Sequence, residues 1–155
     1  MTGFSIPRVS IPAKLLLTDG EQRGGEIYVM ERVPHHSGSE TPLEMLNRPD
    51  GFFPFLPAGE KTIMLVTKAQ TIILSVAPDN TTQDPDRLSA AKLVSVELML
   101  VNGTVLRGFA TAELPEYHSR LLDYLNEPSP FFAVSADDEF HFVNRAHVLY
   151  ARPED

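Results

Sequence analysis

Apolar and polar residues alternate in several short runs of this chain, and a period of two is typical of a half-buried β-strand. In the clearest run, VSVELML at residues 94–100, every second residue is aliphatic. Asn102-Gly103 follows, and such a pair between apolar runs predicts a hairpin because both residues accept a positive φ. Gly108 lies inside the return strand, where a side chain would obstruct a bend or close packing. The pattern predicts antiparallel strands joined by tight turns.

The same arrangement occurs earlier in the chain, where Asp19-Gly20 and Gly25 have the spacing of Asn102-Gly103 and Gly108. Two short helices are also predicted. In the first, TPLEMLN, Thr41 is the expected N-cap, Pro42 occupies the first helical position and Glu44 closes a capping box.

The second helix is expected to begin after Ser119, with Leu121, Leu122 and Leu125 on one face. Both helices run into the same phrase, LNxPxxFF, at residues 46–53 and 125–132. Asparagine tolerates a left-handed conformation, and a proline two residues later disfavours helix before it.

Asn47 and Asn126 therefore mark the predicted helix ends. Each phenylalanine pair begins the next strand, and Phe53 and Phe132 are assigned a structural role. We expect one Phe of each pair to enter the core and its neighbour to cover an edge or an interface. Base stacking is the less favoured alternative, because the pairs lack basic surroundings.

The repeated phrase belongs to a longer internal repeat. Residues 15–25 align with 98–108, and residues 66–72 align with 143–149. We therefore expect one unit at 10–76, a linker at 77–92 and a second unit at 93–153. Each unit is predicted to contain two strands, a short helix and three more strands, the last two forming a hairpin.

Composition favours a folded protein without disulfides. The 155 residues are 43% hydrophobic and 22% charged, and there is no cysteine. No apolar run is long enough to cross a bilayer, and the N-terminus does not resemble a secretory signal. A cytoplasmic location is expected. The net charge of −8 lies mostly in the second half, without the Lys/Arg cluster that binds phosphate backbones, so nucleic acid is not favoured as a partner.

The sequence contains no recognisable catalytic motif: it lacks GxSxG, a P-loop and a dinucleotide fingerprint. A metal site would require histidines to converge with carboxylates, and no standard ligand spacing is present. No catalytic, cofactor or metal residues are predicted, and the protein is not expected to be an enzyme. The histidines are His35, His36, His118, His141 and His147.

Two stretches of the second unit carry a family resemblance. VSVELMLVNGTVLRGFA and FVNRAHVLYA resemble the two sequence motifs of the Sm-like fold, a small bent five-stranded barrel. The resemblance implies a mainly β protein of two tandem Sm-like (SH3-like) five-stranded barrels, each with a short helix inserted between strands 2 and 3. The helix and LNxPxxFF resemble a group of small uncharacterised bacterial domains that carry a RLxDxLN helix.

Sm proteins bind single-stranded RNA in the lumen of a ring. The resemblance implies lumen contacts by Lys68, Asn144 and Arg145. The glycine that follows the basic residue in the family, and its Asp-x-x-Met-Asn segment, are absent here, which weakens the RNA prediction but not ring assembly from open strand edges. We expect a noncatalytic assembly or binding module that forms a homo-oligomer. The alternatives are a single-stranded RNA binder and, with less support, a small-molecule or metal-dependent enzyme.

Overall fold

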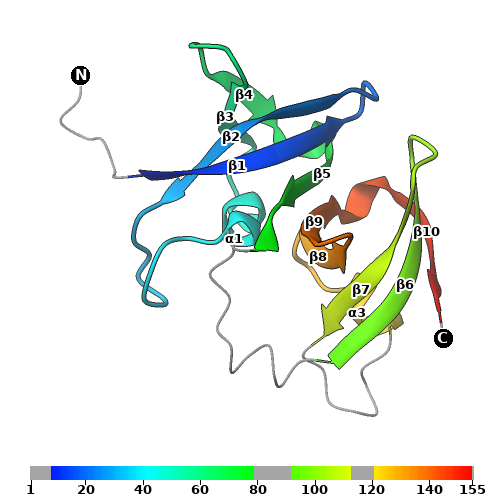
Figure 1. Ribbon diagram of the computed structural model, residues 1–155. Coiled ribbons are helices and arrows are strands. Elements are labelled where there is room, and N and C mark those ends of the chain that lie inside the picture. Colours follow the sequence, from blue (N-terminus) through cyan, green and yellow to red (C-terminus); the bar gives the residue numbers. More distant parts are fainter. Residues whose placement is uncertain (1–7, 79–91, 113–120, 155) are drawn as a thin grey trace.

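In a computed structural model, residues 8–78, 92–112 and 121–154 are described, and their strands form one antiparallel sheet (Figure 1). The first half of the chain comprises β1 (Arg8–Leu17), β2 (Gln22–Met30), α1 (Pro42–Asn47), β3 (Phe52–Pro57), β4 (Met64–Thr67), the 3-10 turn η1 (Lys68–Gln70) and β5 (Thr71–Val76). The second half comprises β6 (Lys92–Leu100), β7 (Val105–Ala112), α3 (Leu121–Leu125), β8 (Phe131–Ala136), β9 (Glu139–Asn144), η4 (Arg145–His147) and β10 (Val148–Pro153).

The ten strands lie in the order β10-β6-β7-β8-β9-β5-β1-β2-β3-β4. The predicted mainly β class is confirmed. Among the described strands the ladder does not close on itself, so the sheet is open, with β10 and β4 at its edges. Within each half the order is the same: the last strand lies beside the first, followed by the second, third and fourth. Most of the predicted linker, residues 79–91, lies outside the described residues.

The prediction that the last two strands of each half form a hairpin is wrong. β4 pairs with β3, and β5 pairs with β1; β10 likewise pairs with β6 rather than with β9. The reason is the 3-10 turn between the two strands, which redirects the chain across the sheet. The Lys68 N–H donates to the Gly51 carbonyl, and the Arg145 N–H donates to the Pro130 carbonyl, both at 2.9 Å.

The hairpins at Asp19-Gly20 and Asn102-Gly103 are confirmed. Their turns differ from the expected type, in which both residues of the pair have a positive φ. Only the glycines have a positive φ, +85° at Gly20 and +89° at Gly103. The preceding side chains instead bond the backbone: Asp19 Oδ1 accepts from the Glu21 N–H, and Asn102 Oδ1 accepts from the Thr104 N–H. Both hairpins therefore use the same Asx turn.

Gly25 and Gly108 mark places where two strands approach closely. A Cβ on Gly25 would meet the Leu56 carbonyl oxygen, and one on Gly108 would meet the Ser135 carbonyl oxygen. Each glycine therefore lets the second strand of its half bend against the third, as the sequence indicated.

The capping box of α1 is confirmed, since the Thr41 hydroxyl accepts from the Glu44 N–H and the Glu44 carboxylate accepts from the Thr41 N–H. The predicted Ser119 cap lies outside the described residues. In α3, Leu121 is buried but Leu122 is exposed, so the expectation that both share the buried face is wrong. They are neighbours in sequence and point about 100° apart on a helix.

The two predicted stops are real helix ends, but no left-handed residue is needed there. The C-cap of α1, Arg48, is extended, with a φ of −64°. Neither Asn47 nor Asn126 has a positive φ. Among the described non-glycine residues, positive φ values occur at Asp137 and Asp138 in the β8–β9 turn.

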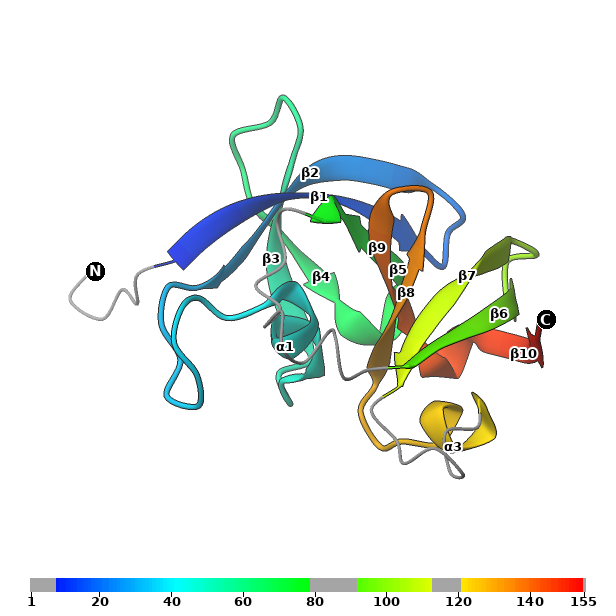
Figure 2. The same ribbon diagram turned by 60° about the horizontal axis from the view of Figure 1, so that its bottom comes forward.

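In the described parts of the chain two hydrophobic clusters form the core, and each draws residues from both halves. The cluster under the first half includes Phe131, Ala133 and Phe142 of the second half. The cluster under the second half includes Ile72 and Ile73 of β5. All six residues of β5 are buried. Figure 2 shows β5, β8 and β9 at the middle of the molecule, where the two halves meet.

Candidate functional site

Lys68, one of the predicted lumen contacts, is buried and points at the end of α1. Its Nζ donates to the main-chain carbonyls of Met45 at 2.7 Å and Arg48 at 3.1 Å. Burial lowers the pKa of this ammonium group. The cation adds a hydrogen bond to the Met45 carbonyl, which also accepts from the Arg48 N–H at 3.3 Å, and one to the carbonyl of the C-cap residue Arg48.

Arg145 does the same in the second half. Its guanidinium donates to the carbonyls of Tyr124 at 2.9 Å and Ser129 at 2.6 Å, and stacks over the Phe132 ring at 4.8 Å. Burial lowers its pKa as well. The basic residue retained in both halves therefore anchors the short helix to the sheet.

Asn144, the third predicted lumen contact, is buried between the halves. Its side-chain N–H groups donate to the carbonyls of Lys68 at 3.2 Å and Thr71 at 3.1 Å, while its oxygen accepts from the Ala146 N–H. All three residues thus make contacts within the chain. Contact with nucleic acid stays a prediction.

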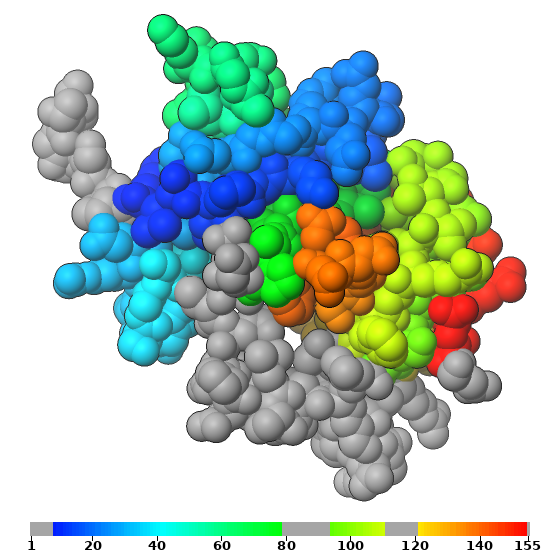
Figure 3. All heavy atoms as spheres, viewed as in Figure 1, coloured from blue at the N-terminus to red at the C-terminus, as the bar shows by residue number. Residues whose placement is uncertain are grey.

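The junction between the halves is a strand pair. β5 runs antiparallel to β9, with Leu74 opposite Phe142 and Ser75 opposite His141. Ser75 Oγ and His141 Nδ1 form a hydrogen bond of 2.7 Å, and burial lowers the pKa of this histidine. Figure 3 shows the end of the β8–β9 hairpin (orange) seated against the first half beside β5 (green).

A side-chain clamp reinforces this junction. Asn47 Oδ1 accepts from the Phe131 N–H at 2.8 Å, and Asn47 Nδ2 donates to the Phe131 carbonyl at 3.3 Å. The clamp joins the asparagine of one LNxPxxFF phrase to the first phenylalanine of the other. Sequence reasoning missed this contact because it interpreted Asn47 as a helix stop, although the exact repetition of both residues was the available signal.

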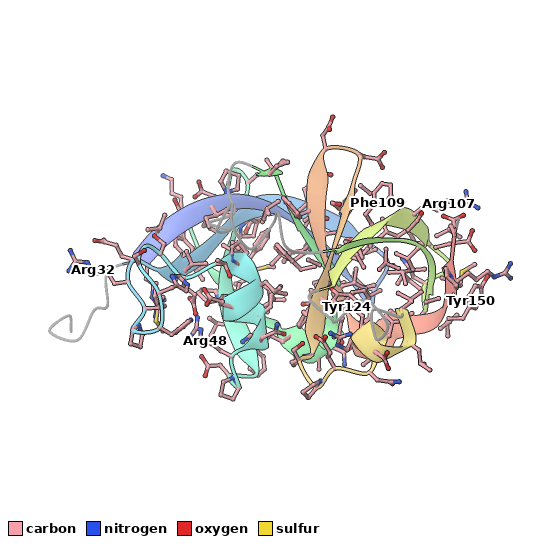
Figure 4. All side chains as sticks on the ribbon, turned by 90° about the horizontal axis from the view of Figure 1, so that it is seen from below. Arg32, Arg48, Arg107, Phe109, Tyr124 and Tyr150 are labelled. Atoms are coloured by element: carbon pink, nitrogen blue, oxygen red, sulfur yellow. The ribbon has the colours of Figure 1, made fainter. Side chains whose placement is uncertain are left out.

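The two edge strands and β3, which lies beside the edge strand β4, in contrast expose large apolar side chains. Phe52 at the start of β3 is 58% exposed, and Leu65 on β4 is 72% exposed. On β10, Leu149 and Tyr150 are exposed, and Figure 4 shows Tyr150 at the end of the molecule opposite Arg32. Phe53 is buried while Phe52 is exposed, as expected, but Phe131 and Phe132 are both buried, so in the second pair both rings enter core clusters.

The loop before α1 brings two histidines to one carboxylate. Glu44 bonds His35 Nε2 at 2.5 Å and His36 Nε2 at 2.7 Å, and one ligand atom from each residue lies within 4.8 Å of the others. Burial alone would raise the pKa of Glu44, but hydrogen bonds from His36, the Thr41 N–H and His35 outweigh it and lower the pKa to about 2.

The hydrogen bond to Glu44 raises the pKa of His36. Two imidazoles and a carboxylate are a ligand set that suits zinc and related divalent cations. The sequence did not indicate this group, because Glu44 was already explained by the capping box and its spacing from the histidines matches no standard motif.

Among the described residues, no helix is long and apolar enough to cross a membrane. No family model, curated protein or solved structure matches the chain.

Proposed function

We propose that this protein is a noncatalytic assembly module that joins copies of itself by pairing β10 of one copy with β4 of the next. The observation that carries the proposal is the β5–β9 junction, in which the last strand of one half pairs with the fourth strand of the other. β10 and β4 are the last strand of the second half and the fourth strand of the first, and they form the sheet edges.

The strand order also supports the likeness to the Sm-like fold. Each half places its strands in the order last, first, second, third, fourth, which suits a small bent five-stranded barrel with a helix inserted between strands 2 and 3. Because each copy offers one edge of each kind, the contact is heterologous and can close into a ring. Unpaired backbone groups at sheet edges favour such pairing.

The experiment that tests assembly is the solution mass by light scattering over a range of concentrations. A subunit has a mass of 17.2 kDa. We expect a discrete multiple of this mass, corresponding to a closed trimer or a larger ring. A mass that stays at one subunit at all concentrations rejects the proposal.

Binding of single-stranded RNA is a separate proposal with less support, since Lys68 and Arg145 bond helix carbonyls. An Arg145→Glu variant would disturb that helix anchor, so its loss of binding would not be diagnostic. The better test is filter retention of single-stranded RNA by the unmodified protein at low salt, where phosphate contacts are strongest. Absence of retention under that condition rejects this function.

The convergence of His35, His36 and Glu44 favours a second candidate, binding of a divalent metal ion. Titration calorimetry with Zn²⁺ alone should give one site per chain that is lost in the His36→Ala variant. His147→Ala removes a histidine that bonds the Ala69 carbonyl and is the matched control. No heat of binding, or equal binding by the two variants, rejects a metal site here.

A further inference from the structure

The internal junction has a counterpart on the outer edges of the molecule. LNxPxxFF begins at residues 46 and 125, so its residues correspond at a separation of 79. The blocks that begin at residues 66 and 143 correspond at a separation of 77. Each junction residue can therefore be compared with the residue at the same place in the other half.

Apolar residues that are buried where the halves meet have exposed counterparts on β3 and on the edge strand β4. Phe131 is 1% exposed, whereas its counterpart Phe52 is 58% exposed. Phe142 of β9 is 1% exposed, whereas its counterpart Leu65 of β4 is 72% exposed.

The other side of the junction shows the same difference. Ile72 and Ile73 of β5 are buried in the cluster of the second half, and their counterparts on β10, Leu149 and Tyr150, are exposed. Both edges therefore present the apolar surface that a neighbouring strand covers inside the chain. Covering it would remove apolar area from water, which is the main force in association.

The polar clamp has counterparts as well. Asn47 holds both the N–H and the carbonyl of Phe131. Its counterpart Asn126 follows α3 and is exposed, and the counterpart of Phe131 is Phe52. In the described part of the chain, no side-chain hydrogen bond holds the Asn126 carboxamide.

We propose that Asn126 of one copy clamps the main-chain N–H and carbonyl of Phe52 in the next copy, so that each LNxPxxFF phrase recognises the next one along the assembly. The inference rests on the proposed self-association and adds its register and its specificity-determining residue. The occupant of each edge is a second copy of this chain. Transferring the β5–β9 register places Ala151 opposite Leu65 and Tyr150 opposite Val66.

The proposed β10–β4 contact between copies is not identical to the β5–β9 junction within the chain. Pro153 of β10 stands where β5 has Val76, and proline cannot donate a ladder hydrogen bond. Arg152 replaces Ser75, so the hydrogen bond between Ser75 and His141 has no equivalent at the edge. Because the β10–β4 contact would have fewer hydrogen bonds between strands, more of the binding free energy between copies would come from the clamp and the apolar side chains.

Cysteine pairing tests the register without background, since the chain has no cysteine. Opposite residues of antiparallel strands have Cα atoms about 4.5–5.5 Å apart, within disulfide range. A Leu65→Cys chain mixed with an Ala151→Cys chain should give a disulfide-linked heterodimer under mild oxidation. A mixture of Leu65→Cys with Arg107→Cys, exposed on β7, should not.

The clamp is tested by Asn126→Ala, with sedimentation velocity as the readout. Losing two hydrogen bonds should raise the dissociation constant between copies by about tenfold or more. Its thermal midpoint, measured at a concentration where the protein is monomeric, should match the unmodified chain, which a merely structural role would not allow. Asn47→Ala removes the internal clamp and should lower that monomer midpoint instead.

The outcomes separate the two proposals. If the unmodified chain is monomeric at every concentration, self-association fails and this inference fails with it. If the chain assembles but Asn126→Ala leaves the dissociation constant unchanged, or the Leu65–Ala151 cysteine pair forms no more disulfide than the control, the clamp and register are overturned while self-association stands.

Discussion

Lys68 and Arg145 show how a residue retained at one position of a repeat can have a structural role. Each cation bonds carbonyls at the end of the short helix of its own half. A buried carbonyl left without a donor costs about 1–3 kcal/mol. The helix, the loop that follows it and the 3-10 turn are therefore held by one side chain.

Replacing Lys68 by methionine should remove both hydrogen bonds while keeping most of the apolar stem. We expect the free energy of unfolding in urea to fall by about 1–3 kcal/mol, since two partly buried carbonyls each lose a hydrogen bond from a charged donor. Lys61→Met, at an exposed position, is the control and should change stability by less than about 0.5 kcal/mol. Equal effects of the two variants would contradict the anchoring role.

The pair of Glu44 and His36 predicts a pH dependence of stability. The pKa of Glu44 falls from its ordinary 4.5 to about 2, so its contribution is present above pH 4.5 and is lost as the pH falls towards 2. The pKa of His36 rises above its ordinary 6.5, so its contribution is present below pH 6.5 and is lost as the pH rises through the raised pKa.

The stabilisation should therefore be complete between about pH 4.5 and 6.5. Urea unfolding of Glu44→Gln and of the unmodified chain should differ most at pH 5.5 and less at pH 8. Glu21→Gln, at an exposed position, controls for the change of charge. A difference that does not vary with pH would show that the imidazoles do not interact with this carboxylate.

At the scale of elements, close contacts between strands determine the positions at which only glycine fits. A Cβ on Gly25 would meet the Leu56 carbonyl oxygen and lie 2.8 Å from Phe55 Cζ, whereas nothing lies within 4 Å of a Cβ on Gly24. Gly25→Ala should reduce the free energy of unfolding by more than about 2 kcal/mol, because backbone must move. Gly24→Ala should change it by about 0.5 kcal/mol or less. Chemical denaturation of the two variants checks this difference.

The sequence indicated those features of the elements that depend on neighbouring residues. The hairpins, the capping box and the close approach at Gly25 and Gly108 follow from turn and backbone chemistry. The terminal hairpin was wrong because a three-residue 3-10 turn carries no strong sequence signal. The clamp and the buried cations depend on contacts between Asn47 and Phe131 or Lys68 and Met45, which local patterns do not reveal.

At the scale of the whole molecule, β5 links the two halves. It pairs with β1 on one side and β9 on the other, and its side chains enter both hydrophobic clusters. Neither half can therefore lose its structure without exposing apolar surface of the other.

We expect the monomer to unfold in a single transition. Calorimetry at a concentration below assembly should give a calorimetric enthalpy equal to the van't Hoff enthalpy. Two separated heat peaks would show that the halves unfold independently. Leu74→Ala, at a buried position of β5, should lower the single midpoint, because it removes about 2–5 kcal/mol of stability.

Because both halves lie in one chain, the β5–β9 junction and the proposed β10–β4 contact can acquire different sequences. In a ring of single-unit subunits, one codon change alters every joint at once. Here β5 and β9 have Ser75 and His141 at the junction, while the corresponding positions of β10 and β4 are Arg152 and Met64. Covalent linkage keeps β5 and β9 at high local concentration. In the proposed assembly, mutation could therefore weaken or retune the contact between copies, and with it the size of the assembly, while the β5–β9 junction stays closed.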